Sequence, residues 1–457
     1  MKIQTINPAT EQLLAEYDCL GEQAIIAKLL AGHQAYSSWK KTPFDLRHNL
    51  MLQLADLLSR NKEDLAQVMC EEMGKPITAG YAEIDKCSWV CTYYANHAES
   101  FLAPRSVEID KGRAMVFYRP LGLVFGIMPW NFPFWQVFRF AVPTIMAGNG
   151  ALLKHAPISC GTGNRIEALF REAGFPEHLF QHLIVDNEGA SAVIKSTYVS
   201  GVTLTGSERA GSSVASQAGH CLKKSVLELG GSDPYVILAD ADLDLAAHCI
   251  VASRLNNSGQ VCIAAKRIIV VKSIAEELTQ KIMEEISTYK MGDPMNLETQ
   301  IGPLARKDLR DNLHNQVEKS IKQGAKLLLG GIIPEGMGFY YPPTVLSNVK
   351  PGMSAFDEEL FGPVLSICAV ENEDEAISFA NRSQYGLGAA VFTRNLHKGE
   401  WIAANEIEAG VCFVNSFVAS DPRLPFGGIK QSGYGRELSR EGILEFVNTK
   451  TVAISDS

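Results

Sequence analysis

The sequence lacks any long hydrophobic run, and this argues against an integral membrane protein. Its most apolar stretch, residues 121–130, is broken by glycine and proline and is shorter than the ~20 residues that a membrane helix needs. The first residues are polar and contain no apolar core of the kind that a secretory signal peptide carries. We therefore expect a cytoplasmic protein with no membrane partner.

Metal and disulfide motifs are also missing, although the chain has ten cysteines and ten histidines. No two cysteines form a C-x-x-C pair and no H-E-x-x-H pattern is present, so we expect no protein-bound metal. The cysteines are scattered along a long chain, and in the cytosol such thiols stay reduced. Whether one of the ten thiols is chemically special is still open at this point.

Basic residues are outnumbered, with 42 lysines and arginines against 51 acidic residues and a net charge of -9. An acidic surface gives no general reason to bind nucleic acid or an anionic membrane. With 46% hydrophobic residues the composition is that of a folded protein. The 457 residues correspond to two or three domains of ~150 residues each.

The spacing of apolar residues divides the chain into a helical part and two α/β series. Residues 21–99 repeat apolar positions every three or four residues, which is typical of helices. Residues 103–119 hold two β-rich runs around a glycine-containing turn and predict a hairpin. From Leu121, and again from Asp233, short apolar strands alternate with helices, which favours mostly parallel sheets covered on both faces. The strands expected first in these series are residues 121–129, 148–156, 182–186 and 201–207.

Cys262 is the first candidate for chemistry, because it follows a glycine-containing turn, Asn257–Gln260. Such a turn can hold the sulfur and the backbone N–H of the cysteine toward the same cavity. The thiolate is the reactive form, so a catalytic site is expected to lower the thiol pKa from ~8.5. On this segment alone a small buried hydrophobic cysteine is the simpler interpretation.

Two polar residues at strand ends are the next candidates. Asn131 lies between two prolines directly after a predicted strand, where its amide could stabilise an oxyanion; the alternative is a kinked turn with a capping asparagine. Glu228 precedes Gly230 and Gly231, which would let its carboxylate swing and act as a general base; the alternative is an ordinary turn with an exposed glutamate.

A fourth motif places Gly206 and Ser207 between a predicted strand and a helix that contains Gly211. The start of a helix after such a turn can bind a pyrophosphate. The motif does not match the G-x-G-x-x-G pattern, so alone it is weak evidence for a dinucleotide site.

Together these motifs resemble the aldehyde dehydrogenase superfamily over essentially the full chain. The segments that carry the resemblance are NPAT (7–10), PWNFP (129–133), Lys154, TGS (205–207) with Gly211, ELGG (228–231), GQVC (259–262), EELFGPV (358–364) and PFGGIKQSGYGRE (425–437).

The resemblance implies a mechanism. Cys262 would attack the aldehyde carbonyl to give a thiohemiacetal, whose oxyanion the Asn131 amide and the Cys262 N–H would hold. Loss of hydride would leave a thioester, which water activated by Glu228 would hydrolyse to a carboxylic acid. A cysteine, a neutral donor and a carboxylate base are the groups that this acyl transfer needs.

The resemblance also implies NAD or NADP as the cofactor. Many NAD-preferring members carry a glutamate three residues after Lys154, and here that residue is Pro157. Loss of the carboxylate removes repulsion against a 2′-phosphate, so we predict that both cofactors are used. The residues that resemble the family's cofactor contacts are Trp130, Lys154, Gly206, Ser207, Gly211, Leu229, Glu359 and Phe361.

Within the superfamily, succinate-semialdehyde dehydrogenases resemble this chain at two of three carboxylate-binding positions. Arg139, eight residues after Asn131, and Ser420 match, whereas the third position is Asn256 instead of arginine. An arginine–carboxylate pair would favour succinate semialdehyde, with glutarate semialdehyde or a medium-chain aldehyde as alternatives. The alternative for Arg139 is a surface position on a helix. Ala264 replaces the second cysteine of a redox switch, so we expect none.

The resemblance implies an α/β fold with a Rossmann-like cofactor domain, a catalytic α/β domain and a β-arm for oligomerisation. The cofactor domain is expected at 1–102 and 120–232, and the catalytic domain at 233–435. The arm is expected at 103–119 and 436–457, and its exposed strand edges predict a homodimer or homotetramer.

Three rival functions share some of these features. An acylating dehydrogenase that uses coenzyme A shares the fold and the nucleophile but generally lacks a base at the position of Glu228. A cysteine hydrolase would need a histidine beside its thiol. A non-enzymatic binding protein would be expected to have lost Cys262, Glu228 or Asn131, and all three are present.

Overall fold

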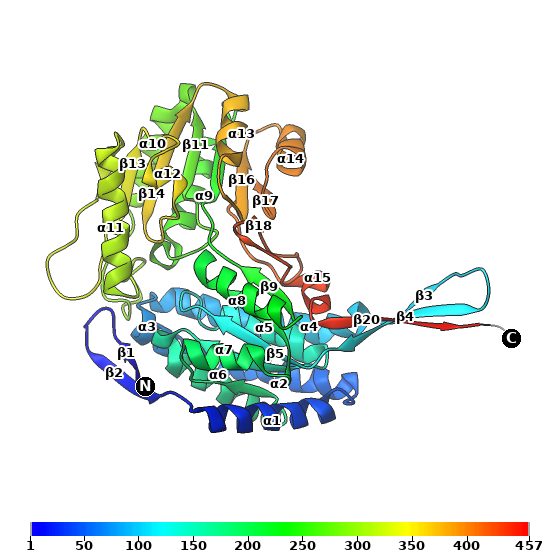
Figure 1. The fold of residues 1–457 in the computed structure, drawn as a ribbon. Helices are drawn as coiled ribbons and strands as arrows, with labels where there is room; N and C mark the ends of the chain where they lie inside the picture. The colour runs from blue at the N-terminus through cyan, green and yellow to red at the C-terminus, as the bar shows by residue number, and fades with distance from the viewer. Residues whose placement is uncertain (1, 456–457) are drawn as a thin grey trace.

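The computed structural model describes residues 2–455, which build two α/β units and a small antiparallel sheet that projects from the body (Figure 1). A two-stranded ribbon and four helices begin the chain and cover the first unit, mostly as expected from the helical periodicity of residues 21–99. The ribbon was not predicted. These elements are β1 (Lys2–Ile6), β2 (Leu13–Asp18), α1 (Glu22–Trp39), α2 (Phe44–Arg60), α3 (Lys62–Met73) and α4 (Ile77–Phe101).

The first unit contains a six-stranded sheet of order β19-β9-β8-β5-β6-β7. The five strands from β9 to β7 in this order run parallel, as the alternating pattern predicted, and only the edge strand β19 is antiparallel. The strand expected at 182–186 instead ends at His182. The strands and helices are β5 (Leu123–Met128), α5 (Trp135–Met146), β6 (Gly150–His155), α6 (Cys160–Glu172), β7 (Phe180–His182), α7 (Asn187–Lys195), β8 (Val199–Thr205), α8 (Glu208–His220), β9 (Lys224–Glu228) and β19 (Gly433–Tyr434).

The order of this sheet decides where a ligand can bind. The chain passes from β5 outward to β6 and β7, and then returns to β8 on the other side of β5. Ligands of open α/β sheets bind at the carboxyl ends of strands beside such a change of direction. Three predicted site segments follow the carboxyl ends of β5, β8 and β9: the turn with Asn131, the turn with Ser207, and Glu228 with its glycines.

Helix α5 is buried around its whole circumference. A helix that is apolar on every side must be covered on every side, and α5 packs against α4 on one side and strands β5 and β6 on the other. Its first residues are fixed by Glu83 of α4, whose Oε1 accepts hydrogen bonds from the N–H groups of Phe134 and Trp135, each at 2.9 Å.

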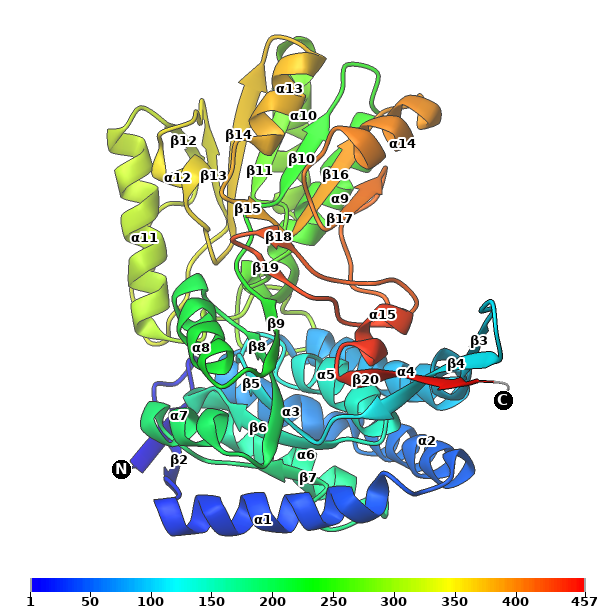
Figure 2. The same ribbon diagram turned by 45° about the vertical axis from the view of Figure 1, so that its right-hand side comes forward.

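The second unit contains a seven-stranded sheet of order β12-β13-β14-β11-β10-β16-β17, parallel except for β12. Its upper position is visible in Figures 1 and 2. Its elements are β10 (Pro234–Ile237), α9 (Leu243–Leu255), β11 (Arg267–Val271), α10 (Lys272–Ile286), α11 (Lys307–Lys322), β12 (Lys326–Leu329), β13 (Thr344–Ser347), α12 (Ser354–Asp357), β14 (Val364–Val370), α13 (Glu373–Asn381), β16 (Gly388–Phe392), α14 (Leu396–Asn405) and β17 (Val411–Val414). A two-stranded ribbon of β15 (Tyr385–Gly386) and β18 (Ile429–Lys430) accompanies it.

One apolar core joins the units: it extends from helices α2–α5 into strands β10 and β11. The units therefore pack closely, as the lack of a linker predicted.

The projecting sheet consists of β3 (Arg105–Val107), β4 (Arg113–Pro120) and β20 (Val447–Ile454) (Figure 2). β3 and β4 form the predicted antiparallel hairpin, and β20 pairs with β4 along eight residues. Helix α15 (Ser439–Leu444) lies between β19 and β20 in sequence but packs on α4 and α5 of the body. Residues 436–446 thus lie outside the projecting sheet.

Candidate active site

Cys262 lies in a loop with an unusual backbone, between the 3-10 turn Asn256–Gly259 and strand β11. Asn257, Ser258 and Gly259 have left-handed φ angles of 50°, 55° and 76° in succession. At Gly259 a side chain would collide with the backbone carbon of Gly362, 2.2 Å from the position of a Cβ atom. Such backbone is costly for non-glycine residues and persists only where neighbouring groups enforce it.

Hydrogen bonds supply that enforcement. Asn257 Nδ2 donates to the Asn131 carbonyl at 2.7 Å, and Ser258 Oγ donates to the Gly302 carbonyl at 3.1 Å. The fully buried Arg254 donates to the carbonyls of Gly259 (2.6 Å), Leu360 (3.1 Å) and Gly362. Because burial disfavours its charge, the pKa of Arg254 is lowered to about 9. The guanidinium ties the cysteine loop to the segment that carries Glu359.

Two cavities meet at Cys262. A larger one, about 520 Å³, extends between α4, α5 and the loops around Asn256 and Ser420. A smaller one, about 180 Å³, extends between the carboxyl ends of β5, β8 and β9. Cys262 lines both, and so does Gln136, which was not predicted as a site residue. We call them the large cavity and the small cavity.

Asn131 is buried beside the cysteine loop, as the motif required. Its Nδ2 donates to the Gln260 carbonyl at 3.1 Å, two residues before Cys262. The residue lines the small cavity. This places an amide donor beside the cysteine loop, on a cavity that Cys262 also lines, and the role of oxyanion donor stays a proposal.

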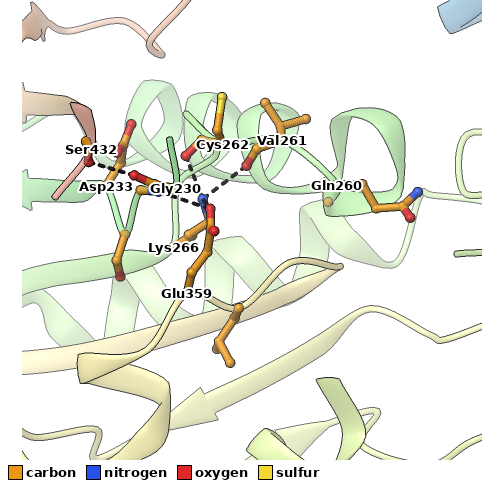
Figure 3. Close-up of polar contacts among 12 residues, drawn as sticks. Gly230, Asp233, Gln260, Val261, Cys262, Lys266, Glu359 and Ser432 are labelled. Carbon is orange, nitrogen blue, oxygen red and sulfur yellow. Dashed lines mark hydrogen bonds and ion pairs between the residues drawn. The ribbon is translucent and has the colours of Figure 1, made fainter. Parts of the chain in front are cut away.

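Lys266 fixes the backbone of the cysteine and was missed in the sequence. Its Nζ donates to the carbonyls of Val261 (3.1 Å) and Cys262 (2.6 Å) and pairs with Glu359 Oε1 at 2.9 Å. Figure 3 shows that the Cys262 sulfur points away from this cluster while its carbonyl faces the ammonium. Glu359 also accepts a hydrogen bond from the Gly231 N–H at 3.1 Å. Nothing in the sequence distinguishes this lysine from others near a strand start.

The thiol of Cys262 is not acidified in this structure. Burial raises its pKa to about 12, and the opposing charges of Lys266 and Arg139 only partly offset this. The expectation that the site lowers the thiol pKa is therefore wrong for the protein described here. The main reason is burial of the thiol; Lys266 opposes it only in part, and its ammonium faces the Cys262 carbonyl rather than the sulfur (Figure 3).

Glu228 is buried and lines neither cavity, so the alternative of an exposed turn glutamate is wrong. Its Oε1 lies toward Gly427, 2.8 Å from the place of a Cβ there, and has no hydrogen-bond partner among residues 2–455. Burial raises the pKa of this carboxyl well above its usual value, and the nearby Arg139 charge opposes that shift. Glu228 must turn toward Cys262 to act on it.

Arg139 lines the large cavity but is committed to a carboxylate of the protein itself. It forms a buried ion pair with Glu437, and its Nη2 lies 3.4 Å from Thr205 Oγ1. The alternative of a surface helix position is wrong, because only 2% of the residue is exposed. The prediction that Arg139 is available to a substrate carboxylate does not fit this ion pair. It was based on the spacing of Arg139 from Asn131, and that spacing cannot show that the folded chain brings Glu437 against the arginine.

Asn256 and Ser420 lie on the large cavity as predicted, and Lys86 of α4 lies there with them. Lys86 Nζ donates to Ser420 Oγ at 2.8 Å, and Trp135 Nε1 donates to the same oxygen at 3.1 Å. Lys86 was not predicted as a site residue, because it lies within a long helix that precedes Cys262 by 176 residues.

The small cavity has the groups that a nicotinamide dinucleotide requires. Trp130 and Phe361 form its aromatic wall, with ring centroids 5.7 Å apart, and the Glu359 carboxylate is held at its edge. Ser207 caps helix α8, so the positive end of the helix faces this side. The predicted contacts Trp130, Gly206, Ser207, Leu229, Glu359 and Phe361 all line this cavity.

Two other predicted cofactor residues lie outside the small cavity. A Cβ on Gly211 would lie 2.6 Å from the Leu229 side chain, so the glycine lets helix α8 pack closely. Lys154 lines a separate hollow with Pro157. Its Nζ has no carboxylate within 4.0 Å in the described part of the chain. Asp186 and Glu188 line the same hollow, but neither forms an ion pair with Lys154, which lies on β6 next to β5.

Within residues 2–455 no group of three metal-binding side chains is found. No helix in that range is long and apolar enough to cross a membrane. The ten cysteines, all within it, are free thiols.

Comparisons with known proteins identify the family of the chain. The sequence model of the Aldehyde dehydrogenase family matches residues 1–452. A succinate semialdehyde dehydrogenase of Escherichia coli (strain K12), named for NAD(P)+, is 46% identical over 448 residues, which are 98% of this chain and 97% of that protein. A probable NADP+-linked succinate-semialdehyde dehydrogenase of Synechocystis is 46% identical over 455 residues, with both chains covered to 100%.

Solved structures give the same result. The succinic semialdehyde dehydrogenase of Streptococcus pyogenes in complex with NADP+ has a TM-score of 0.97 at 38% identity, with 99% of this chain and 100% of that chain covered. This confirms the predicted fold class. Cys262 lies on a strained loop between two cavities, and the motifs of one superfamily surround it. Because the family model matches almost the whole sequence, the chain belongs to the aldehyde dehydrogenase family.

Proposed function

We propose that this protein oxidises succinate semialdehyde to succinate with NAD or NADP. The observation that carries the proposal is that Cys262 lines both the large cavity and the small cavity, so one sulfur can face an aldehyde and a nicotinamide at once. The names of the Escherichia coli and Synechocystis relatives support this substrate.

In this reaction the Cys262 sulfur bonds to the aldehyde carbon, and the carbonyl oxygen becomes an oxyanion. The Asn131 amide and the Cys262 N–H stabilise that oxyanion, a contact often worth several kcal/mol. When bound in the small cavity, NAD(P)+ would accept the hydride that leaves the former aldehyde carbon, and a thioester of Cys262 remains. Water then adds to the thioester carbon, and the carbon–sulfur bond breaks to release succinate and the thiol.

Glu228 is the base that takes the proton from the Cys262 thiol before it attacks the aldehyde, and later a proton from the water that hydrolyses the thioester. Its pKa is raised by burial, which brings its basicity closer to that of the buried Cys262 thiol. Glycines at 230 and 231 follow it and allow the carboxylate to leave its place near Gly427 and reach Cys262.

Use of both cofactors follows from position 157. Pro157 adds no carboxylate that would repel a 2′-phosphate, and Lys154 in the same hollow, which Asp186 and Glu188 also line, can pair with the phosphate. The two relatives named above carry NAD(P)+ and NADP+ in their names.

A homodimer or homotetramer in the cytoplasm completes the proposal. The projecting sheet has an open backbone edge at the short strand β3, and such edges pair readily with another chain. Light scattering of the purified protein measures the assembly.

The test is a panel of aldehydes with each cofactor. We expect turnover of succinate semialdehyde with NAD and with NADP, succinate as the product, and no coenzyme A requirement. Cys262→Ala should lower kcat by roughly 10⁴-fold or more and leave binding of the cofactor intact. Cys221→Ala, at the end of α8, is the matched control and should behave like the wild type. Product that forms only with coenzyme A, or activity retained in Cys262→Ala, would reject the proposal.

A further inference from the structure

Two cations line the large cavity, and they differ in what already neutralises them. Arg139 is paired with Glu437 in the protein interior. Lys86 has no carboxylate within 4.0 Å of its Nζ among residues 2–455, and its one hydrogen-bond acceptor is the hydroxyl of Ser420 at 2.8 Å. The ammonium has three N–H groups, so Lys86 keeps donors for a further partner.

The donors around Lys86 converge. Trp135 Nε1 and Lys86 Nζ both donate to Ser420 Oγ, at 3.1 Å and 2.8 Å. Lys86 Nζ also lies 4.3 Å from the centre of the Trp135 ring. Trp135 and Ser420 are both buried. A cation and an indole N–H that share one hydroxyl form a donor-rich corner of the kind that a carboxylate would fill.

The acidic residues nearest to this corner are engaged elsewhere. Glu83 pairs with Lys75 and accepts the N–H groups at the start of α5. Asp421 pairs with Arg423 at 2.6 Å. Neither is therefore free to neutralise Lys86. Since an unpaired cation in a partly buried place is unfavourable, an anion brought by a ligand would be stabilised here.

We infer that Lys86, with Trp135 and Ser420, binds the distal carboxylate of the aldehyde substrate, and that Arg139 does not. This rests on the proposed function, because it assigns the substrate's charged end. The carboxylate accepts from Lys86 Nζ and Trp135 Nε1 in place of the Ser420 hydroxyl, which turns its own proton toward the anion. The aldehyde end points to Cys262 on the same cavity.

The test compares succinate semialdehyde with butanal, a neutral aldehyde of the same chain length. In Lys86→Met the ratio of kcat/KM for succinate semialdehyde over that for butanal should fall about 100-fold, as loss of a charge-assisted contact predicts. Lys86→Arg keeps the charge and should restore most of the ratio. Lys62→Met, which removes an exposed lysine paired with Asp85, is the matched control and should leave the ratio unchanged.

Product inhibition gives a second readout that does not depend on turnover of the anionic aldehyde. With butanal as substrate, the inhibition constant of succinate should rise at least tenfold in Lys86→Met. Ser420→Ala, which keeps the cation, serves as the second variant and should raise the same constant less.

The outcomes separate this inference from the proposed function. A wild-type enzyme that oxidises butanal but not succinate semialdehyde rejects the proposed function. A wild-type enzyme that oxidises both, with an unchanged ratio and succinate inhibition constant in Lys86→Met, rejects only the role of Lys86. An Arg139→Lys variant that alone loses the ratio would return the role to position 139.

Discussion

Lys86 and Arg139 both reach the large cavity from neighbouring helices, α4 and α5, yet they stand in opposite electrostatic conditions. Arg139 is enclosed and paired with Glu437, within reach of the buried Glu228. Lys86 is partly exposed and bonded to a hydroxyl and an aromatic ring. The first arrangement is already neutral, whereas the second leaves a charge to be used.

The difference shows that the availability of a cation depends on its partners. Breaking a buried ion pair is costly because it leaves an uncompensated charge in the interior. To bind a substrate carboxylate, Arg139 would have to give up its contact with Glu437. Lys86 would lose only a hydrogen bond to Ser420. Binding an anion is therefore the less costly change at Lys86.

The largest effect is expected when Arg139 is replaced, and this substitution tests the comparison most directly. Arg139→Met leaves Glu437 buried without a counter-charge, which should lower the free energy of unfolding by about 3–5 kcal/mol. It also changes the charge beside Glu228, the proposed base, so kcat/KM should fall roughly 100-fold for succinate semialdehyde and butanal alike. Steady-state kinetics and denaturant unfolding measure the two effects.

Arg139→Lys preserves the charge and is the control for that experiment; it should recover most of the lost stability. A loss confined to succinate semialdehyde, with butanal turnover and stability kept, would contradict the comparison and place the carboxylate at Arg139.

The next effect concerns pH. Burial and the charge of Arg139 lower the pKa of Lys86 to about 8, while Cys87, Glu83 and Asp421 act in the opposite direction. Below pH 8 the free enzyme carries the ammonium, and above it the ammonium is lost. KM for succinate semialdehyde should therefore rise up to about tenfold per pH unit above 8, and KM for butanal should not.

In Lys86→Arg that rise should disappear, because arginine keeps its charge over this range. Initial rates between pH 6.5 and 9.5 provide the measurement. Equal rises of KM for both aldehydes would show that the titrating group is not specific to the anion.

The smallest effect extends the comparison to a third cation, Lys154, which also has no carboxylate within 4.0 Å in the described chain. Pro157→Glu places a carboxylate in the hollow that both residues line. Repulsion of about 1 kcal/mol against the 2′-phosphate should lower kcat/KM for NADP about fivefold relative to NAD. Pro157→Gln is the neutral control, and equal effects of both variants would assign the change to shape rather than charge.

Much of the fold was readable from local patterns. The alternation of strands and helices predicted parallel sheets, and the turn before Arg113 predicted the hairpin of β3 and β4. The ribbon of β1 and β2 was missed because its strands are short and mostly exposed, so they lack a clear apolar alternation. The start and end of β7 were also misplaced, since a three-residue strand carries little periodic signal.

The site shows the same division. Motifs identified Cys262, Asn131 and Glu228, and most predicted cofactor contacts line the small cavity. Lys86 and Lys266 were missed because they belong to no motif. The pKa of the thiol was misjudged as well, because the residue types around Cys262 do not reveal how completely the folded chain buries its sulfur.

The sequence by itself determined the family, the order of the elements and the residue types at the reacting centre, because these depend on spacing along the chain. Only the tertiary structure decided which charges neutralise one another. Arg139 pairs with Glu437, which is 298 residues further along the chain, and Lys86 donates to Ser420, which is 334 residues further along. Ion pairing falls off within a few ångströms in space, so no pattern along the chain shows which cation is left for the substrate.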